Sequence, residues 1–243
     1  WRDFQRAPLV GALHGAVLAA FGGLLFAVGR DYFWFLAGAF SGFLLIAPVL
    51  AVGLYAMSRA FERGERAGLA LVWRTWLSWR GHPHHDWRLV RFGLLLALAG
   101  TGWVLTSASL ITLFAPAPIA TPLDFLRHVV LAREGFLFEA WLALGGVLAA
   151  PVFASSVITL PLLLDRRIGV LEAVLTSWRA VLANPLPLAL WAALIMGITL
   201  LALLPAMLGL LIAVPWLGHA SWHAYRATVD ASPFPLRETS AAT

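Results

Sequence analysis

The sequence has no cysteine and no lysine, so all 17 of its basic residues are arginine, against 12 acidic residues in a chain of 243. The lack of cysteine excludes disulfide bonds, thiolate metal sites and cysteine nucleophiles. Charged residues are also scarce, at 12% of the chain, about half of the ~25% typical of a soluble globular domain. Hydrophobic residues make up 61%. This composition indicates a membrane protein. The chain begins with Trp1 rather than Met, so we expect its natural start to lie upstream.

Several apolar runs, bounded by charge, proline or glycine, reach the ~20 residues that a helix needs to cross a bilayer. Residues 186–218 contain no charged residue and are too long for one crossing, so we expect Pro205 and Gly209 to divide them with a tight turn. The sequence thus predicts an all-α polytopic protein, with one membrane domain over residues 1–226 and a cytoplasmic tail over 227–243. The six expected spans are residues 9–29, 32–57, 89–114, 135–163, 185–204 and 206–226.

The arginines orient these spans. If the N-terminus is cytoplasmic, 14 arginines fall on the cytoplasmic side and three on the other, an asymmetry that the positive-inside rule predicts. We therefore expect an inner-membrane protein with both termini in the cytoplasm. The cytoplasmic set is Arg2, Arg6, Arg59, Arg63, Arg66, Arg74, Arg80, Arg88, Arg91, Arg166, Arg167, Arg179, Arg226 and Arg237, and the opposite set is Arg30, Arg127 and Arg133.

Two cytoplasmic connections have the pattern of amphipathic helices. In IGVLEAVLTSWRAVLAN the apolar face holds Ile168, Leu171, Leu175, Trp178 and Leu182, opposite Glu172, Thr176 and Arg179. In RAFERGERAGLALVWRTWLSW it holds Leu69, Val72, Trp73, Trp76 and Leu77, opposite Ala70, Arg74 and Ser78. Both patterns suit helices that lie in the membrane interface, where arginine meets the phosphates of anionic lipids; packing beneath the bundle is the alternative. The residues assigned to lipid contact are Arg59, Arg63, Arg66, Trp73, Arg74, Trp76, Trp178, Arg179 and Trp222.

The same two connections resemble each other. Glu62-Arg63, Gly68-Leu69 and Trp73-Arg74 parallel Asp165-Arg166, Gly169-Val170 and Trp178-Arg179. A parallel internal repeat would explain this, with each unit entering the cytoplasm, running along the interface and returning.

Small residues predict which helices touch within the bilayer, because apolar side chains gain little by leaving lipid for each other. Gly11 and Gly15 have the G-x-x-x-G spacing in the first span, and Gly38 and Gly42 have it in the second. We therefore expect these two spans to approach each other closely.

The middle of every expected span lacks Asp, Glu, Lys, Arg and His. Ion-coupled transporters usually keep an ionisable group at that depth, so this class is disfavoured. The nearest candidate, Glu139, is expected to be an interfacial carboxylate. The sequence also has no Walker A, G-x-S-x-G or H-E-x-x-H motif, so nothing in it supports an enzyme.

Three histidines form the candidate cofactor site. His219 and His223 lie one helical turn apart in GHASWHAYR, and His14 lies at a similar depth in the first span. Three imidazoles would converge on haem or a metal ion if the first and sixth spans are neighbours. The alternative is that these histidines are structural, in an interfacial belt with Trp222. We expect no cofactor. The loop histidines His82, His84 and His85 are expected to bind metal ions only adventitiously, if at all.

Four segments carry a family resemblance: WRDFQRAP, LIAPVLAVGLYAMSRAFERGE, LPLLLDRRIGVLEAVLTSWRAVLANPLPLALWAALI and PWLGHASWHAYR. Over nearly its whole length the chain resembles bacterial predicted integral membrane proteins of unknown function. Some members of that family carry the label of cytochrome c oxidase subunits. The resemblance implies association with an oxidase at most, because the chain lacks the histidines and the length of the catalytic subunit.

These observations lead to three hypotheses of different class. The first is a non-catalytic accessory or scaffold subunit of a larger membrane complex, with a respiratory complex as the assembly that the label suggests. The second is a small transporter or lipid-handling protein. The third is a haem- or metal-binding protein that uses His14, His219 and His223. We expect membrane lipids and other membrane-protein subunits as partners, and no nucleic acid.

Overall fold

The computed structural model describes residues 1–80, 86–132 and 135–237, together with their side chains except at residues 40–48. Within these ranges the chain is helical and contains no β-strand, which confirms the expected all-α class. The long helices are α2 (Pro8–Gly29), α3 (Phe33–Leu50), α6 (Arg88–Phe114), α8 (Leu137–Ser156), α11 (Pro185–Leu203) and α12 (Leu210–Thr228). The short ones are α1 (Arg2–Arg6), α4 (Val52–Glu62), α5 (Leu69–Trp76), η1 (Ser78–Arg80), α7 (Pro122–Phe125), η2 (Leu126–Val130), α9 (Thr159–Asp165) and α10 (Val170–Ala183).

Among the described residues, four segments are long and apolar enough to cross a membrane: α2, α6, α8 continued by α9, and α11. Two of the six expected spans are not among them. The sixth falls on α12, where His219, His223 and Arg226 lower the mean hydropathy. The second falls on α3 and α4, which are separated at Ala51, and α3 contains residues 40–48, outside the part of the chain to which the count of four applies. The six-span count therefore stays a prediction. The expected turn at Pro205 does separate α11 from α12, with Ala206 and Met207 in the left-handed region.

The chain forms two compact units. Unit 1 comprises residues 1–19, 48–93 and 153–243, and unit 2 comprises residues 20–47 and 94–152. Every arginine assigned to the cytoplasmic face belongs to unit 1. Of the three assigned to the opposite face, Arg30 and Arg127 belong to unit 2, and Arg133 lies outside the described residues. The units thus divide the arginines as the topology prediction does.

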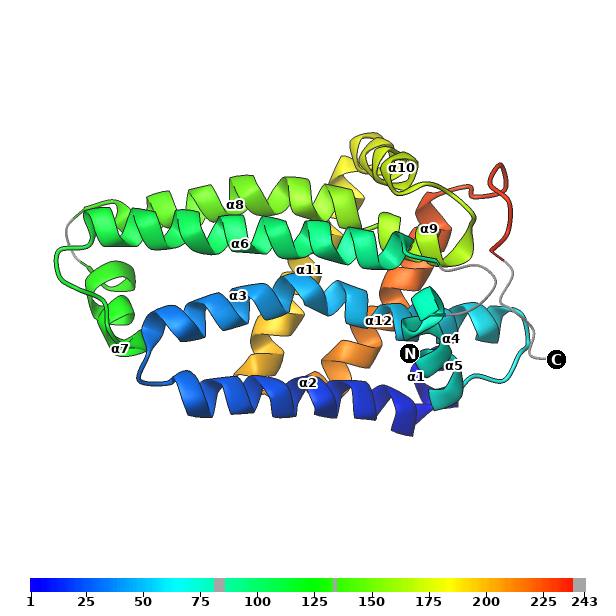
Figure 1. The fold of residues 1–243 in the computed structure, drawn as a ribbon, viewed down its shortest axis with the longest axis horizontal. Coiled ribbons are helices and arrows are strands. Elements are labelled where there is room, and N and C mark those ends of the chain that lie inside the picture. Colours follow the sequence, from blue (N-terminus) through cyan, green and yellow to red (C-terminus); the bar gives the residue numbers. More distant parts are fainter. Residues whose placement is uncertain (81–85, 133–134, 238–243) are drawn as a thin grey trace. The chain divides into compact units, whose positions relative to one another are not determined.

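Helix α4 is the core of unit 1. Residues 52–60 are all buried, and α4 packs against α1, α5, α9 and α12 (Figure 1). The sequence predicted that the first part of α4 is the end of the second membrane span, residues 32–57, in contact with lipid. Instead, Leu54 and Met57 join Val72 of α5 in an apolar cluster, and Gly218 of α12 lets Leu54 approach its backbone. A helix that is apolar on most sides is stable when protein surrounds it in this way.

Helices α2 and α12 touch through the first glycine pair. A Cβ atom added to Gly15 would collide with the carbonyl oxygen of Leu210, and one added to Gly11 would lie 2.9 Å from Cβ of Pro215. Gly11 and Gly15 were expected to face the second span, and they face α12 instead. The first and second expected spans nevertheless touch elsewhere, because a Cβ atom added to Gly53 would lie 3.2 Å from Nε2 of His14. Gly38 instead faces Val104 of α6. The first and sixth expected spans are therefore neighbours.

Both amphipathic segments are helices, each beginning after a glycine with extended backbone, Gly68 or Gly169. On α10 the small residues Ala173, Ser177 and Ala180 are buried. The large apolar side chains Leu171, Leu175, Trp178 and Leu182 are exposed by 72%, 47%, 36% and 73%. This favours a helix whose apolar face points away from the protein over one packed beneath a bundle through that face.

On α5 the predicted apolar face is divided. Val72 is buried and Trp76 donates a hydrogen bond to the carbonyl of Leu50, whereas Leu69 and Trp73 are exposed. The order of elements is nevertheless the same in the two segments: a long helix, a short helix, an extended glycine, and an amphipathic helix. This order is what an internal repeat predicts, and the repeat itself stays a proposal.

Unit 2 has an aromatic core. Phe33, Ile111, Ile119 and Val129 are buried together, and Phe125 and Trp141 pack against them. The ring of Phe125 stacks on Phe33 and lies edge-on to Trp141. Trp103 of α6 also contacts Trp141 of α8, so aromatic rings join these two helices.

Candidate functional site

A buried polar chain joins α1, α4 and α12 in unit 1. The hydroxyl of Ser58 donates to Oδ2 of Asp3 at 2.8 Å and lies 2.8 Å from Nδ1 of His219. Because the hydroxyl has one proton, which goes to Asp3, its oxygen accepts the Nδ1 proton of His219. Asp3, Ser58 and His219 are 8%, 0% and 1% exposed. The serine is therefore a hydrogen-bond relay between two helices, and its proton points away from the imidazole that would have to act as its base.

His223 continues this chain toward the surface. Its Nε2 lies 2.8 Å from Oδ2 of Asp3, and its Nδ1 lies 3.7 Å from Oε1 of Glu62. Glu62 also pairs with Arg226 at 3.4 Å. Burial works against the ionised form of Asp3, but the hydrogen bonds from Ser58 and His223 and the positive charge near it outweigh this and lower the pKa of Asp3.

A second cluster centres on the ion pair of Arg59 and Asp165. Nε of Arg59 lies 3.1 Å from Oδ1 of Asp165, and both side chains are 6% exposed. Oδ2 of the same carboxylate accepts hydrogen bonds from Tyr225 at 3.0 Å and from Arg166 at 2.9 Å. Burial, aided by the charge of Arg63 and opposed by Asp165, lowers the pKa of Arg59 to about 10. Arg59 therefore remains charged at neutral pH, and the pair joins α4, α9 and α12.

The C-terminal segment 229–237 packs on this cluster. The backbone N–H of Arg237 donates to the carbonyl of Asp165 at 2.9 Å, and that of Arg167 donates to Pro235 at 2.8 Å. The guanidinium of Arg237 pairs with Asp86 at 2.9 Å. The described part of the expected tail is thus bound to unit 1.

Arg88 at the start of α6 completes the cluster. It pairs with Asp86 at 2.7 Å and donates to the carbonyls of Arg166 and Ile168. Burial raises the pKa of Asp86, but the hydrogen bond from Arg88 and the charges of Arg237 and Arg88 outweigh it, so that the pKa is lowered overall. This contact ties the beginning of α6 to the connection between α9 and α10.

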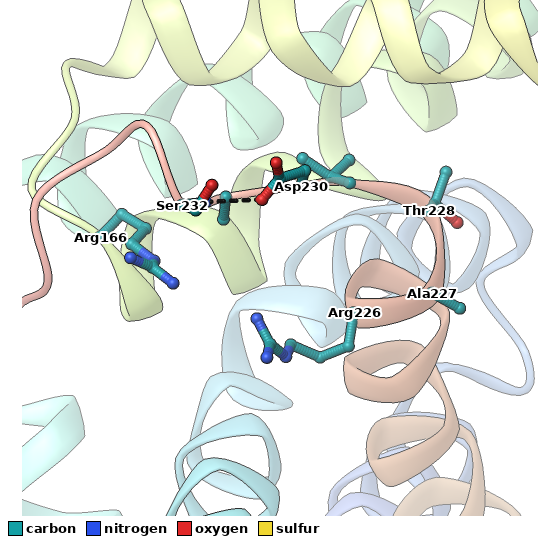
Figure 2. Close-up of a pocket in the computed structure, with 8 residues that line it drawn as sticks. Arg166, Arg226, Ala227, Thr228, Asp230 and Ser232 are labelled. Carbon is teal, nitrogen blue, oxygen red and sulfur yellow. Dashed lines mark hydrogen bonds between the residues drawn. The ribbon is translucent and has the colours of Figure 1, made fainter.

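A hollow of about 370 Å³ opens beside these clusters, between Arg166, Arg226 and residues 227–232 (Figure 2). Asp230 lies on its wall and accepts a hydrogen bond from the backbone N–H of Ser232 at 2.9 Å. Each arginine already has a carboxylate partner, Asp165 for Arg166 and Glu62 for Arg226. The hollow therefore carries both signs of charge and has no excess of positive charge with which to hold an anion.

The three histidines predicted to share a cofactor take different partners. Nδ1 of His14 lies 2.8 Å from the carbonyl of Val10, and its ring lies edge-on to Trp76. His219 contacts Ser58 and His223 contacts Asp3. The structure thus links His219 and His223 through Ser58 and Asp3, and it gives His14 a separate hydrogen-bond partner. Within the described ranges, no group of three His, Asp or Glu residues is arranged to hold a metal ion. His82, His84 and His85 lie outside those ranges.

The residues predicted to contact lipid divide into two groups. Arg63, Arg66, Trp73, Arg74, Trp178 and Arg179 are exposed, and Trp76 is half-buried. Arg59 and Trp222 are buried, at 5% and 1% exposure, and so contact protein instead. Their positions near expected helix ends suggested an interface, but α4 and α12 are packed inside unit 1 there.

Sequence reasoning did not single out Asp3 or Ser58. It considered Asp86 only beside the loop histidines and Tyr225 only as part of an interfacial belt. One signal was available in YAMSRA, where adjacent Ser58 and Arg59 interrupt an apolar run. Such a pair in a buried helix requires polar partners from other elements.

The fold and the clusters together define the class of protein. Four helical segments of the described residues are long and apolar enough to cross a membrane, and ionic networks join the short elements of unit 1. This is an integral membrane protein. The chain belongs to the family described as predicted integral membrane protein (DUF2189), whose pattern matches residues 35–165, more than half of the chain. No curated protein and no solved structure matches it.

Proposed function

We propose that this integral membrane protein is a non-catalytic accessory or scaffold subunit of a larger inner-membrane assembly. The observation that carries the proposal is a face of small residues on α8. Ala143, Gly146 and Ala150 are exposed, and a Cβ atom added to Gly146 would meet nothing within 4 Å. Their spacing puts them on one side of the helix, where a neighbouring helix can approach closely.

The ionic clusters of unit 1 support the same function. Arg59, Asp165, Asp86 and Arg237 are paired with each other, with backbone carbonyls, or with neighbouring arginines. Groups used in this way hold helices in place. A unit whose charged groups serve to hold its helices together suits a scaffold.

The test is the recovery of a partner from native membranes. The full chain, tagged and extracted in a mild detergent, is expected to bring a stoichiometric membrane-protein partner identified by mass spectrometry. A respiratory complex is the first assembly to examine. Gly146→Leu is expected to lose the partner, because the added side chain blocks close helix approach. Leu148→Phe, on another side of α8 at a position that is 38% exposed, is the control and should retain it. A chain found only as a monomer or homo-oligomer would contradict the proposal.

We also propose that the exposed arginines of unit 1 face the cytoplasm and meet anionic lipid. The arginine distribution supports this, as do Arg179 and Trp178 side by side on α10. Vesicles with anionic lipid should bind the reconstituted protein's cytoplasmic face more tightly than neutral ones, and added salt should weaken the difference.

A further inference from the structure

Unit 2 contains a cavity between α3, α6, α7 and α8. Its volume is about 230 Å³. Phe33, Trp34, Trp103, Phe125 and Trp141 supply aromatic walls. The cavity exists because the remaining positions between these rings are filled by smaller residues.

The lining of this cavity has few polar groups. Nε1 of Trp141 donates to the hydroxyl oxygen of Ser107 at 2.7 Å, and no lining residue is charged. A charged ligand would therefore lose its hydration without gaining an oppositely charged partner. The lining favours an apolar occupant.

The size and setting of the cavity narrow the choice further. Its volume exceeds the ~150 Å³ of an apolar cavity that stays dry and binds benzene, yet is below the ~300 Å³ at which pockets for whole small molecules begin. Only part of a larger molecule would fit. Helices α6 and α8 belong to candidate membrane spans, and Trp34 on the rim is 39% exposed. The apolar molecules at hand in that setting are membrane lipids.

We propose that this cavity holds one hydrocarbon chain of a membrane lipid, packed against the aromatic rings of unit 2 while the rest of the lipid stays in the bilayer. The site is independent of the scaffold function, because the small-residue face of α8 does not line it.

Photo-crosslinking in vesicles tests the site. The full-length protein is reconstituted in phosphatidylcholine that contains a diazirine-bearing palmitoyl chain, and labelled peptides are mapped by mass spectrometry. Label is expected on the lining residues Trp103 and Ala108. Ala108→Phe fills the cavity and is expected to lose this label. Leu105→Phe, on the same helix at a position that is 63% exposed, is the matched control and should keep it.

The outcomes separate clearly. The site is supported if cavity residues are labelled in the wild type and the label is lost in Ala108→Phe. A parallel experiment with a diazirine-bearing isoprenoid alcohol shows whether that type of chain labels the cavity more strongly than the acyl chain. If Ala108→Phe does not fold, Ala37→Leu fills the cavity from α3 instead. The proposal is overturned if neither probe labels the lining residues, or if label there persists in the folded filling variant.

Discussion

Arg59 is the residue whose replacement we expect to destabilise the protein most. Arg59→Met removes one partner of a buried ion pair and leaves the carboxylate of Asp165 with Arg166 as its remaining counter-charge. Such a change costs about 3–5 kcal/mol in the free energy of unfolding. Thermal unfolding in detergent should show a large fall in midpoint. Arg30→Met is the control, because Arg30 and Asp31 are 68% and 78% exposed and their pair contributes little. Equal midpoints for the two variants would contradict the role assigned to Arg59.

Asp3 should make stability depend on acidic pH. Its folded-state pKa is lowered from 3.8, so folding favours the ionised carboxylate. This contribution is fully present above 3.8 and is lost as the pH falls through the lower folded-state value. The unfolding midpoint of the wild type should therefore exceed that of Asp3→Asn at pH 6, and the gap should close as the pH falls below 3.8. A gap independent of pH would show that Asp3 acts through packing alone.

At the residue scale, the sequence could predict that His219 and His223 lie on one side of their helix, because they are one turn apart. It could not predict that His223 contacts Asp3 or that His219 reaches Asp3 through Ser58, since Asp3 lies 220 positions from His223 in the chain. Contacts at such separation depend on which helices are adjacent, and periodicity carries no information about adjacency. The same reason explains why Arg59 was read as exposed.

At the scale of elements, the packing of α2 on α12 depends on Gly15. Gly15→Ala places a methyl group against the backbone of Leu210, so we expect a loss of about 1–3 kcal/mol from overpacking. Gly23→Ala in the same helix is the matched control, because a Cβ atom there meets nothing within 4 Å. That variant should be neutral or slightly more stable, since alanine favours helix. Thermal unfolding of the two variants checks this, and a neutral Gly15→Ala would refute the contact.

Helix α10 offers a second test at this scale. The absence of native cysteine allows a fluorophore on a single introduced cysteine. A label at Leu175→Cys should be quenched by a lipid-soluble nitroxide, and one at Glu172→Cys by iodide in water. This difference follows if the exposed apolar face lies in the membrane interface. Equal accessibility of both labels to iodide would place the helix in water.

The helices themselves were largely predictable, because long apolar runs and the 3.6-residue period are local signals. The division of 186–218 into α11 and α12 followed from Pro205. The split of the second span into α3 and α4 did not, because Ala51 carries no breaker signal and the break reflects the packing of α4 inside unit 1.

For the whole molecule, the number of crossings decides how the chain is threaded through the membrane. Four or six spans are both even, so each reading puts the two termini on one side. They differ in where the loop between α4 and α5 lies. If α3 crosses, Arg66 is on the cytoplasmic side with the N-terminus; if it does not, Arg66 is on the same side as Arg30.

Cysteine accessibility separates these readings. Arg30→Cys and Arg66→Cys are both at exposed positions, and each is treated in intact cells with a membrane-impermeant thiol reagent. We expect Arg30→Cys to react at once and Arg66→Cys only after permeabilisation. The physical reason is that the buried network joins α4, α9, α12 and the start of α6 in one unit, so the loop after α4 should share the side of Arg88 and Arg237. Prompt reaction at both positions would reject the crossing of α3 and, with it, the six-span topology.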